Sequence, residues 1–281
     1  MKSILLLCLI FLSCPIFSSE FLINIPKTSV NENRDVFELD LLKFLLQKSG
    51  VTFKFIFTKP MSQERVSEEL KKGTLDIYWM GTSNKLETGL IPIRFPIYRG
   101  LLGYRIFIIN KKNINKFKKI KNLNDLQQLV GIQDRGWNDI PILTHSGLKP
   151  IEAPYKSIYK MLDAGRNIDY FSRGMTEAYN ELEGEIKKLP NLMVEENILL
   201  TYKYPLFYFI SPHNKVLSNT LHKAFKQSFD DGSFFRFFNS HKVIINALKK
   251  VNLSSRVKIN ILNPFLSKET EQLGELYWYS L

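Results

Sequence analysis

Arginines in two loop segments are the strongest candidates for chemistry in this chain. The segment 90–105 carries three arginines among prolines and aromatic residues, and Arg173 follows the apolar run 167–171. A guanidinium binds carboxylates through two parallel hydrogen bonds. At least one arginine of the first segment should pair with an acidic residue of the chain itself. We expect Arg94, Tyr98 and Arg173 to contact a small polar solute.

A second group of candidates lies at the end of the apolar segment 74–80. Gly81 allows a close backbone approach to a ligand, and Thr82 offers a hydroxyl. Residues alternate between the two faces of a strand, so either Tyr78 or Trp79 points inward. Core packing therefore explains Trp79 as well as ligand contact does. We expect Trp79, Gly81 and Thr82 to line the binding site.

The segment 131–139 has the pattern of a strand, a tight turn and a helix start. Exposed N–H groups at such a turn attract anions. Gln133 can point into a cleft there, and Trp137 can stack on a ligand. Tyr170 occupies the corresponding edge of the strand expected at 167–171, so it joins the expected ligand contacts.

Sequence signatures of common enzymes are missing from the chain. It has no G-x-S-x-G, no P-loop, no H-E-x-x-H and no glycine-rich dinucleotide motif. Its four histidines are scattered, without the spacing that places two on one helix face. We therefore predict no catalytic residue, no metal ligand and no cofactor.

Residues 1–19 have the composition of a secretory signal. Lys2 precedes an apolar run over 4–17 that is too short to cross about 30 Å of hydrocarbon, so export with cleavage is expected. Both cysteines, Cys8 and Cys14, fall in this leader, which excludes a disulfide in the remaining chain. Residues 11–14 also resemble a lipoprotein cleavage box, so acylation of Cys14 is the alternative.

The chain of 281 residues carries a formal charge of +12 and is 44% hydrophobic, enough for a substantial core. The densest basic run, 111–121, contains a single aromatic residue, Phe117, and no nucleic-acid-binding signature. An exported chain rarely meets nucleic acid, so a solvated surface is the expected role. The positive field could still steer an acidic solute or hold the protein near anionic lipid.

Apolar and amphipathic segments alternate along the chain, which predicts an α/β fold with mainly parallel, doubly wound sheets. The apolar segments 103–110 and 204–211 are long enough to cross between two bodies. Two such crossover strands imply two lobes with a central ligand cleft. The expected organisation is a signal peptide at 1–19, lobe 1 at 20–104 and 204–250, lobe 2 at 105–203, and a C-terminal extension at 251–281.

Several motifs together resemble the type II periplasmic solute-binding proteins, in the family that includes amino-acid receptors of ABC transporters. The resemblance covers about residues 21–240 and extends, in 94–104 and 165–174, to a bacterial subgroup. It implies a hinged monomeric clamp in the periplasm that presents its solute to a membrane permease or sensor protein. The matching segments are LDIYWMGTS (75–83), FPIYRGLLGYRIFII (95–109), VGIQDRGW (130–137), IDYF (168–171) and LHKAFKQSFDDGSFFRFF (221–238).

Two departures from the family pattern bear on the solute. The family's amino-acid receptors usually carry an arginine soon after the Gly-x-Thr segment, whereas 82–89 has none and Arg94 is the nearest. The same receptors place an aspartate after the second lobe's strand, where this chain has Ser172 and Arg173. The resemblance, so modified, implies an anionic or aromatic-bearing solute in place of an ordinary amino acid.

Two other functions stay open. One is an envelope interaction protein with a degenerate cleft, working through its basic surface. The other is a dehydratase-like enzyme on the same fold, which would use cleft carboxylates from Glu87, Asp134, Asp139 and Glu177. The tail 254–281 extends beyond the family's usual end, and we expect a strap over one lobe or a partner-docking segment.

Overall fold

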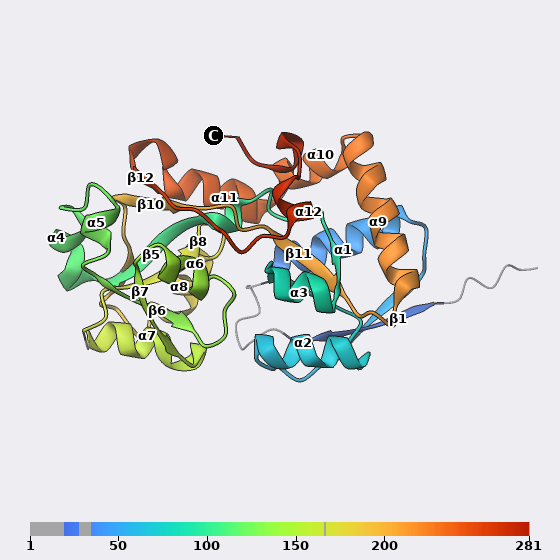
Figure 1. Cartoon of the computed structure of the whole chain (residues 1–281), viewed down its shortest axis with the longest axis horizontal. Helices are drawn as coiled ribbons and strands as arrows, with labels where there is room; N and C mark the ends of the chain where they lie inside the picture. Colours follow the sequence, from blue (N-terminus) through green and yellow to red (C-terminus); the bar gives the residue numbers. More distant parts are fainter. Residues whose placement is uncertain (1–19, 28–34, 166, 281) are drawn as a thin grey trace, which may run out of the picture.

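The computed structural model describes residues 20–27, 35–165 and 167–280, so the predicted leader and Cys14 lie outside the described residues. The chain forms two α/β lobes side by side (Figure 1). Among the described residues, no helix combines the length and the apolar character that crossing a bilayer requires.

Lobe 1 contains the N-terminal part of the chain and a later return. Strands β1 and β2 pair in parallel, and β11 lies between β3 and β4 with antiparallel pairing on both sides. Its strands are β1 (Phe21–Pro26), β2 (Phe53–Thr58), β3 (Ile77–Gly81), β4 (Ile91–Ile93) and β11 (Leu206–Ile210). Its helices are α1 (Val36–Lys48), α2 (Gln63–Lys72), α3 (Asn84–Gly89), α9 (Lys215–Asp230) and α10 (Ser233–Ser240).

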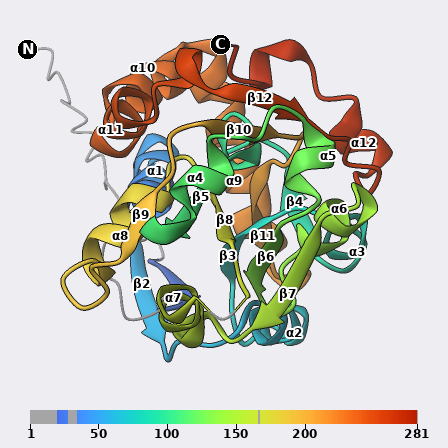
Figure 2. The same cartoon turned by 90° about the vertical axis from the view of Figure 1, so that its left-hand side faces the viewer.

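Lobe 2 is built on one mixed sheet of order β12-β10-β5-β8-β6-β7, with β9 also paired to β5. Figure 2 views this lobe from its outer side. Its strands are β5 (Tyr104–Asn110), β6 (Val130–Asp134), β7 (Lys149–Ala153), β8 (Tyr170–Gly174), β9 (Leu192–Val194), β10 (Ile198–Thr201) and β12 (Val257–Asn260). Its helices are α4 (Ile114–Phe117), α5 (Leu123–Leu126), α6 (Ile140–His145), α7 (Tyr155–Ala164) and α8 (Ala178–Glu185).

Local sequence signals explain the helices of lobe 1. The apolar face of α1 is completely buried through Leu41, Leu42 and Leu45, as the spacing predicts. Helix α2 begins at Ser62, whose hydroxyl accepts the N–H of Arg65, and ends at Gly73 in the left-handed conformation. Helices α9 and α10 are separated at residues 231–232, where the sequence predicts a break.

The prediction of mainly parallel sheets is correct for only part of the molecule. Strand β5 runs antiparallel to β8, β9 and β10, while β6 pairs in parallel with β7 and β8. Strand β5 runs in the opposite direction to its neighbours because the chain enters lobe 2 from lobe 1 at the start of this strand. The two crossings run side by side there, and Tyr202 donates its N–H to the carbonyl of Gly103 at 3.1 Å.

The C-terminal segment crosses between the lobes twice more. After α11 (Lys242–Val251), strand β12 joins the lobe 2 sheet beside β10, and α12 (Lys268–Glu271) then packs on lobe 1. We call residues 257–279 the C-terminal strap, which runs over both lobes (Figures 1 and 2). The sequence predicted a strap over one lobe, which is wrong, because β12 finds a free sheet edge on the other.

Candidate functional site

A cavity of about 590 Å³ lies between the two lobes and is lined by both. Its floor carries buried charged side chains, its walls carry aromatic rings, and exposed charged residues stand at its rim. The floor residues are Asp35, Glu38, Arg105, Asp139 and Arg173; the rings are Tyr78, Trp79, Trp137, Tyr155 and Tyr204; the rim residues are Lys27, Glu64, Arg135 and Lys156.

The lobes touch each other across this cavity. Asn138 of lobe 2 donates a hydrogen bond of 3.0 Å to the carbonyl of Gly81 in lobe 1. Gly136 has φ +78 and lies so close to Glu64 of α2 that a Cβ atom there would be 2.5 Å from a carboxylate oxygen. The two lobes are therefore in contact beside the cavity.

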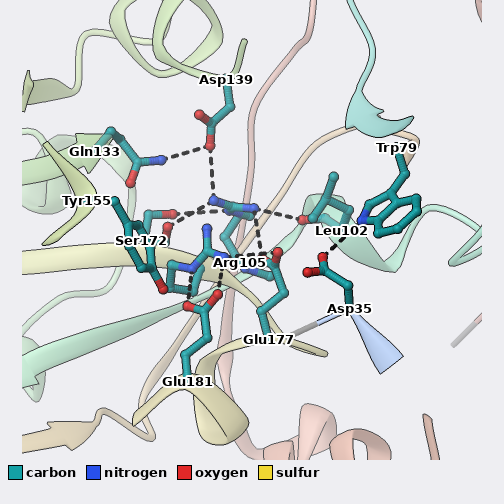
Figure 3. A network of polar contacts seen from close by, with 12 residues as sticks. Asp35, Trp79, Leu102, Arg105, Gln133, Asp139, Tyr155, Ser172, Glu177 and Glu181 are labelled. Atoms are coloured by element: carbon teal, nitrogen blue, oxygen red, sulfur yellow. Dashed lines mark hydrogen bonds and ion pairs between the residues drawn. The ribbon is translucent and has the colours of Figure 1, made fainter. Parts of the chain in front are cut away.

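Arg105 holds the floor of lobe 2 together (Figure 3). Its guanidinium donates to Asp139 at 3.0 Å, to the carbonyl of Ser172 at 2.8 Å and to the carbonyl of Leu102 at 3.1 Å. Gln133 also donates to the same oxygen of Asp139, at 2.8 Å. The other oxygen of Asp139 is buried without a hydrogen-bond partner.

Arg173 is paired with two carboxylates, those of Glu177 and Glu181. Both of its hydrogen bonds to Glu181 measure 2.6 Å, and Glu177 lies 2.9 Å away. Burial lowers the pKa of Arg173, but Glu177 and Glu181 outweigh it and raise that pKa well above its usual value. The ring of Trp137 covers the guanidinium at 4.5 Å. A ligand anion would have to compete with these partners for the guanidinium.

Asp35 and Glu38 form the acidic part of the lobe 1 floor. Trp79 donates its indole N–H to Asp35 at 2.9 Å, while one oxygen of each carboxyl is buried without a partner. Burial raises the pKa of Glu38 well above its usual range, and the neighbouring Asp35 raises it further. Among the described residues, no arginine or lysine forms a salt bridge with Asp35 or Glu38.

Carboxyl groups therefore outnumber guanidiniums in the buried polar set. The buried Asp139 and Glu181 and the partly buried Glu177 already surround the two arginines, so within the described part of the chain Asp35 and Glu38 have no buried counterion. In a site of low dielectric constant this excess attracts positive charge. Within the described residues, no three histidine, cysteine or carboxylate side chains are grouped as metal ligands would be.

Four of the nine predicted ligand contacts line the cavity: Trp79, Gly81, Trp137 and Arg173. Gly81 is required for a reason that the sequence did not reveal, because a Cβ atom there would lie 2.2 Å from the ring of Tyr204. Trp79 is nearly buried, yet it faces the cavity and binds Asp35.

The other five predicted contacts lie behind the cavity wall. Thr82 and Arg94 both donate to Glu87 of α3, at 2.5 Å and 3.0 Å. Tyr98 stacks on Phe37 at 4.8 Å and its hydroxyl hydrogen-bonds to Glu38. Gln133 supports Asp139, and Tyr170 packs on Phe107 beneath Gly131.

The sequence analysis missed Asp35, Glu38 and Glu181 as site residues. A signal for Glu38 was present, because it lies three and four residues before Leu41 and Leu42 and so falls on the apolar face of α1. A carboxylate on a buried helix face needs a partner or a function. Asp35 and Glu181 have no comparable pattern, since Asp35 precedes the first residue of α1 and Glu181 lies within the short helix α8.

Searches with family models and among curated proteins return no match. Solved structures do resemble this chain. An amino acid ABC transporter substrate-binding protein from Streptococcus pneumoniae, bound to L-arginine, has a TM-score of 0.55 at 14% identity and covers 80% of this chain and 94% of its own. The ancestral amino acid-binding protein AncCDT-1, a precursor of cyclohexadienyl dehydratase, has a TM-score of 0.55 at 18% identity, with 78% and 94% covered.

A histidine kinase sensor domain with similarity to periplasmic binding proteins also aligns, with a TM-score of 0.55 at 14% identity and 78% and 93% of the two chains covered. Sequence identities as low as these support a shared fold and do not identify the ligand. The two α/β lobes, the paired crossings and the cavity between them agree with these neighbours. The chain therefore has the two-lobed type II periplasmic-binding-protein fold.

Proposed function

We propose that this protein is an extracytoplasmic solute-binding protein whose cleft closes on a small organic cation. The observation that carries the proposal is the pair of buried carboxyls, Asp35 and Glu38, which both line the cavity between the lobes and each keep one oxygen without a hydrogen-bond partner. A cationic group placed there would gain charge-assisted hydrogen bonds that the protein itself does not supply.

The anionic solute expected from the sequence has lost its support. That expectation relied on Arg94 and Arg173, and both guanidiniums are now seen beside carboxylates of the chain. The cavity supports the other part of that expectation, an aromatic-bearing solute, because five aromatic rings line it. A guanidinium or ammonium group lying against such rings also gains cation–π attraction.

The rim favours a ligand with a second, negative end. Lys27, Arg135 and Lys156 are exposed around the mouth of the cavity, opposite the acidic floor. A molecule with its cation on the floor would place an anionic tail among them. The bound L-arginine of the pneumococcal neighbour has both kinds of group, which makes it the first ligand to try.

The test is a binding screen on the mature protein after unfolding and refolding, since a resident ligand would hide the response. We expect L-arginine, L-lysine or spermidine to raise the melting temperature, and L-glutamate and benzoate to leave it unchanged. A ligand at a hundred times its Kd stabilises the folded state by about 2.7 kcal/mol. Asp35→Asn should weaken cation binding at least tenfold, while Glu64→Gln, at the exposed rim, should change it little.

The partner would be a membrane permease of an ABC transporter or a sensor protein, with the binding protein acting as a monomer in the periplasm after removal of residues 1–19. Recovery of the ligand unchanged after long incubation would support binding without catalysis. A ligand that is consumed would favour the dehydratase-like alternative, for which the cleft carboxylates and the AncCDT-1 neighbour speak. Stabilisation by L-glutamate alone would contradict the cationic ligand.

A further inference from the structure

Asp35 and Glu38 lie one helical turn apart at the start of α1, and both side chains are about nineteen-twentieths buried. Each has one carboxyl oxygen without a hydrogen-bond partner, and both line the same cavity. Two buried carboxylates so close cannot both carry a charge cheaply in the absence of a cation. Without a bound cation, a proton on one of the two carboxyls therefore lowers the free energy of the site.

The groups around the pair indicate which carboxyl holds that proton. One oxygen of Asp35 accepts a hydrogen bond of 2.9 Å from the indole N–H of Trp79. Burial, the neighbouring Asp35 and the like charge of Glu177 from lobe 2 raise the pKa of Glu38, and they outweigh its hydrogen bonds with its own backbone N–H and with Tyr98. The hydroxyl of Tyr208 donates to the backbone carbonyl of Glu38 and so does not neutralise the side chain.

We propose that Glu38 holds a proton in the empty cleft and releases it when a ligand cation binds, so that ligand binding exchanges one positive charge for another. The inference rests on the proposed function, since it needs a cationic ligand. The released proton goes to solvent, and no covalent bond of the ligand changes. The net charge of the buried site is therefore the same before and after binding.

This exchange explains how one site can be both stable when empty and selective for a cation when filled. Burial disfavours the charged form of Glu38, as the raised pKa of its carboxyl indicates. A ligand cation beside Asp35 and Glu38 reverses this preference through its own charge. A neutral ligand of the same shape does not, so it leaves the proton in place.

The experiment is isothermal titration calorimetry of the refolded protein with L-arginine as probe, in buffers of different ionisation enthalpy and across the neutral pH range. We expect release of close to one proton per ligand, and an affinity that rises up to tenfold per pH unit while Glu38 is protonated in the empty site. Glu38→Gln, which has the shape of the protonated acid, should remove the proton release and the pH dependence. Glu68→Gln, on the exposed face of α2 and outside the cavity, should keep both.

A second measurement needs no ligand. Infrared difference spectra between the protein and Glu38→Gln at neutral pH should contain the carbonyl stretch of a protonated carboxylic acid. If that band is missing, or if L-arginine binds without releasing a proton, the exchange is refuted while the proposed function stands. If the band is present but L-arginine, L-lysine and spermidine all fail to bind, the proposed function fails and the exchange fails with it.

Discussion

The carboxylate of Glu87 in lobe 1 accepts a hydrogen bond of 2.8 Å from the hydroxyl of Thr270, which belongs to the far end of the C-terminal strap. The same carboxylate also accepts from Ser267, Thr82 and Arg94. It is almost completely buried and has four donors. Glu87 thus anchors the C-terminal strap to lobe 1. The other end of the strap, strand β12, belongs to the lobe 2 sheet.

Replacing Glu87 by Gln should destabilise the protein by about 1–3 kcal/mol, because the amide accepts fewer hydrogen bonds and leaves buried donors unsatisfied. Arg94 would also lose the charge that it pairs with. Chemical denaturation followed by circular dichroism measures the change. Glu68→Gln on the exposed face of α2 is the matched control and should change the free energy of unfolding by less than about 0.5 kcal/mol.

The double variant Ser267→Ala with Thr270→Ala should release the lobe 1 end of the strap and leave its lobe 2 end in place. Strand β12 keeps its backbone pairing with β10, and Arg256 keeps its bonds to the carbonyls of residues 195 and 198. Hydrogen exchange should therefore rise in residues 267–273 and stay low in 257–260. Equal exchange throughout the strap would mean that Glu87 is not its anchor.

Arg173→Ala should reduce the free energy of unfolding by more than it reduces the free energy of ligand binding. The substitution leaves Glu181 and Glu177 buried without their counterion, and breaking a buried pair in this way costs about 3–5 kcal/mol. Arg135→Ala, at the exposed rim, is the control and should unfold at the same denaturant concentration as the original protein. Replacing Arg173 and Glu181 together by Met and Leu should recover part of the loss, since only the partly exposed Glu177 then lacks its arginine. Full stability of the single variant would show that the pair is weak.

Periodicity and turn residues were sufficient to predict the two α/β lobes and most helices, but not the direction of every strand. The apolar face of α1, the glycine that ends α2 and the break between α9 and α10 depend on interactions within a few residues, which a sequence displays directly. The pairing of Arg173 with Glu181 is also local, eight residues apart, but nothing in the pattern shows whether an arginine faces a ligand or its own chain. That choice is decided by packing within lobe 2.

The long-range contacts could not be predicted either, because tertiary packing and not the local sequence decides them. Thr82 and Glu87 are close in sequence, but the other partners of Glu87, Ser267 and Thr270, are about 180 residues away. Asp35 and Trp79 are 44 residues apart and meet only because β1 and β3 lie next to each other. A single sequence contains no record of such pairs, so the acidic floor of the cleft emerged only from the structure.

The last prediction concerns the pH dependence of stability through Glu195, which is buried beside Arg256 in lobe 2. Burial outweighs two backbone N–H donors and the arginine, and raises the pKa of Glu195 to about 7 from a usual 4.5. Between these values the folded protein binds a proton that the unfolded chain has lost. The free energy of unfolding should therefore fall as the pH rises from about 4.5 to about 7, by about 3 kcal/mol, and then level off.

Denaturant titrations at several pH values in this window measure the effect. Glu195→Gln should flatten the slope, because the amide does not titrate, whatever it does to stability at any single pH. Glu196→Gln, the exposed neighbour, should keep the slope of the original protein. Because Glu38 contributes a slope of the same sign, some pH dependence should survive in Glu195→Gln and disappear when Glu38→Gln is added. A slope unchanged by Glu195→Gln would mean that Arg256 keeps the carboxylate ionised and that the pair, and not burial, decides the charge at this position.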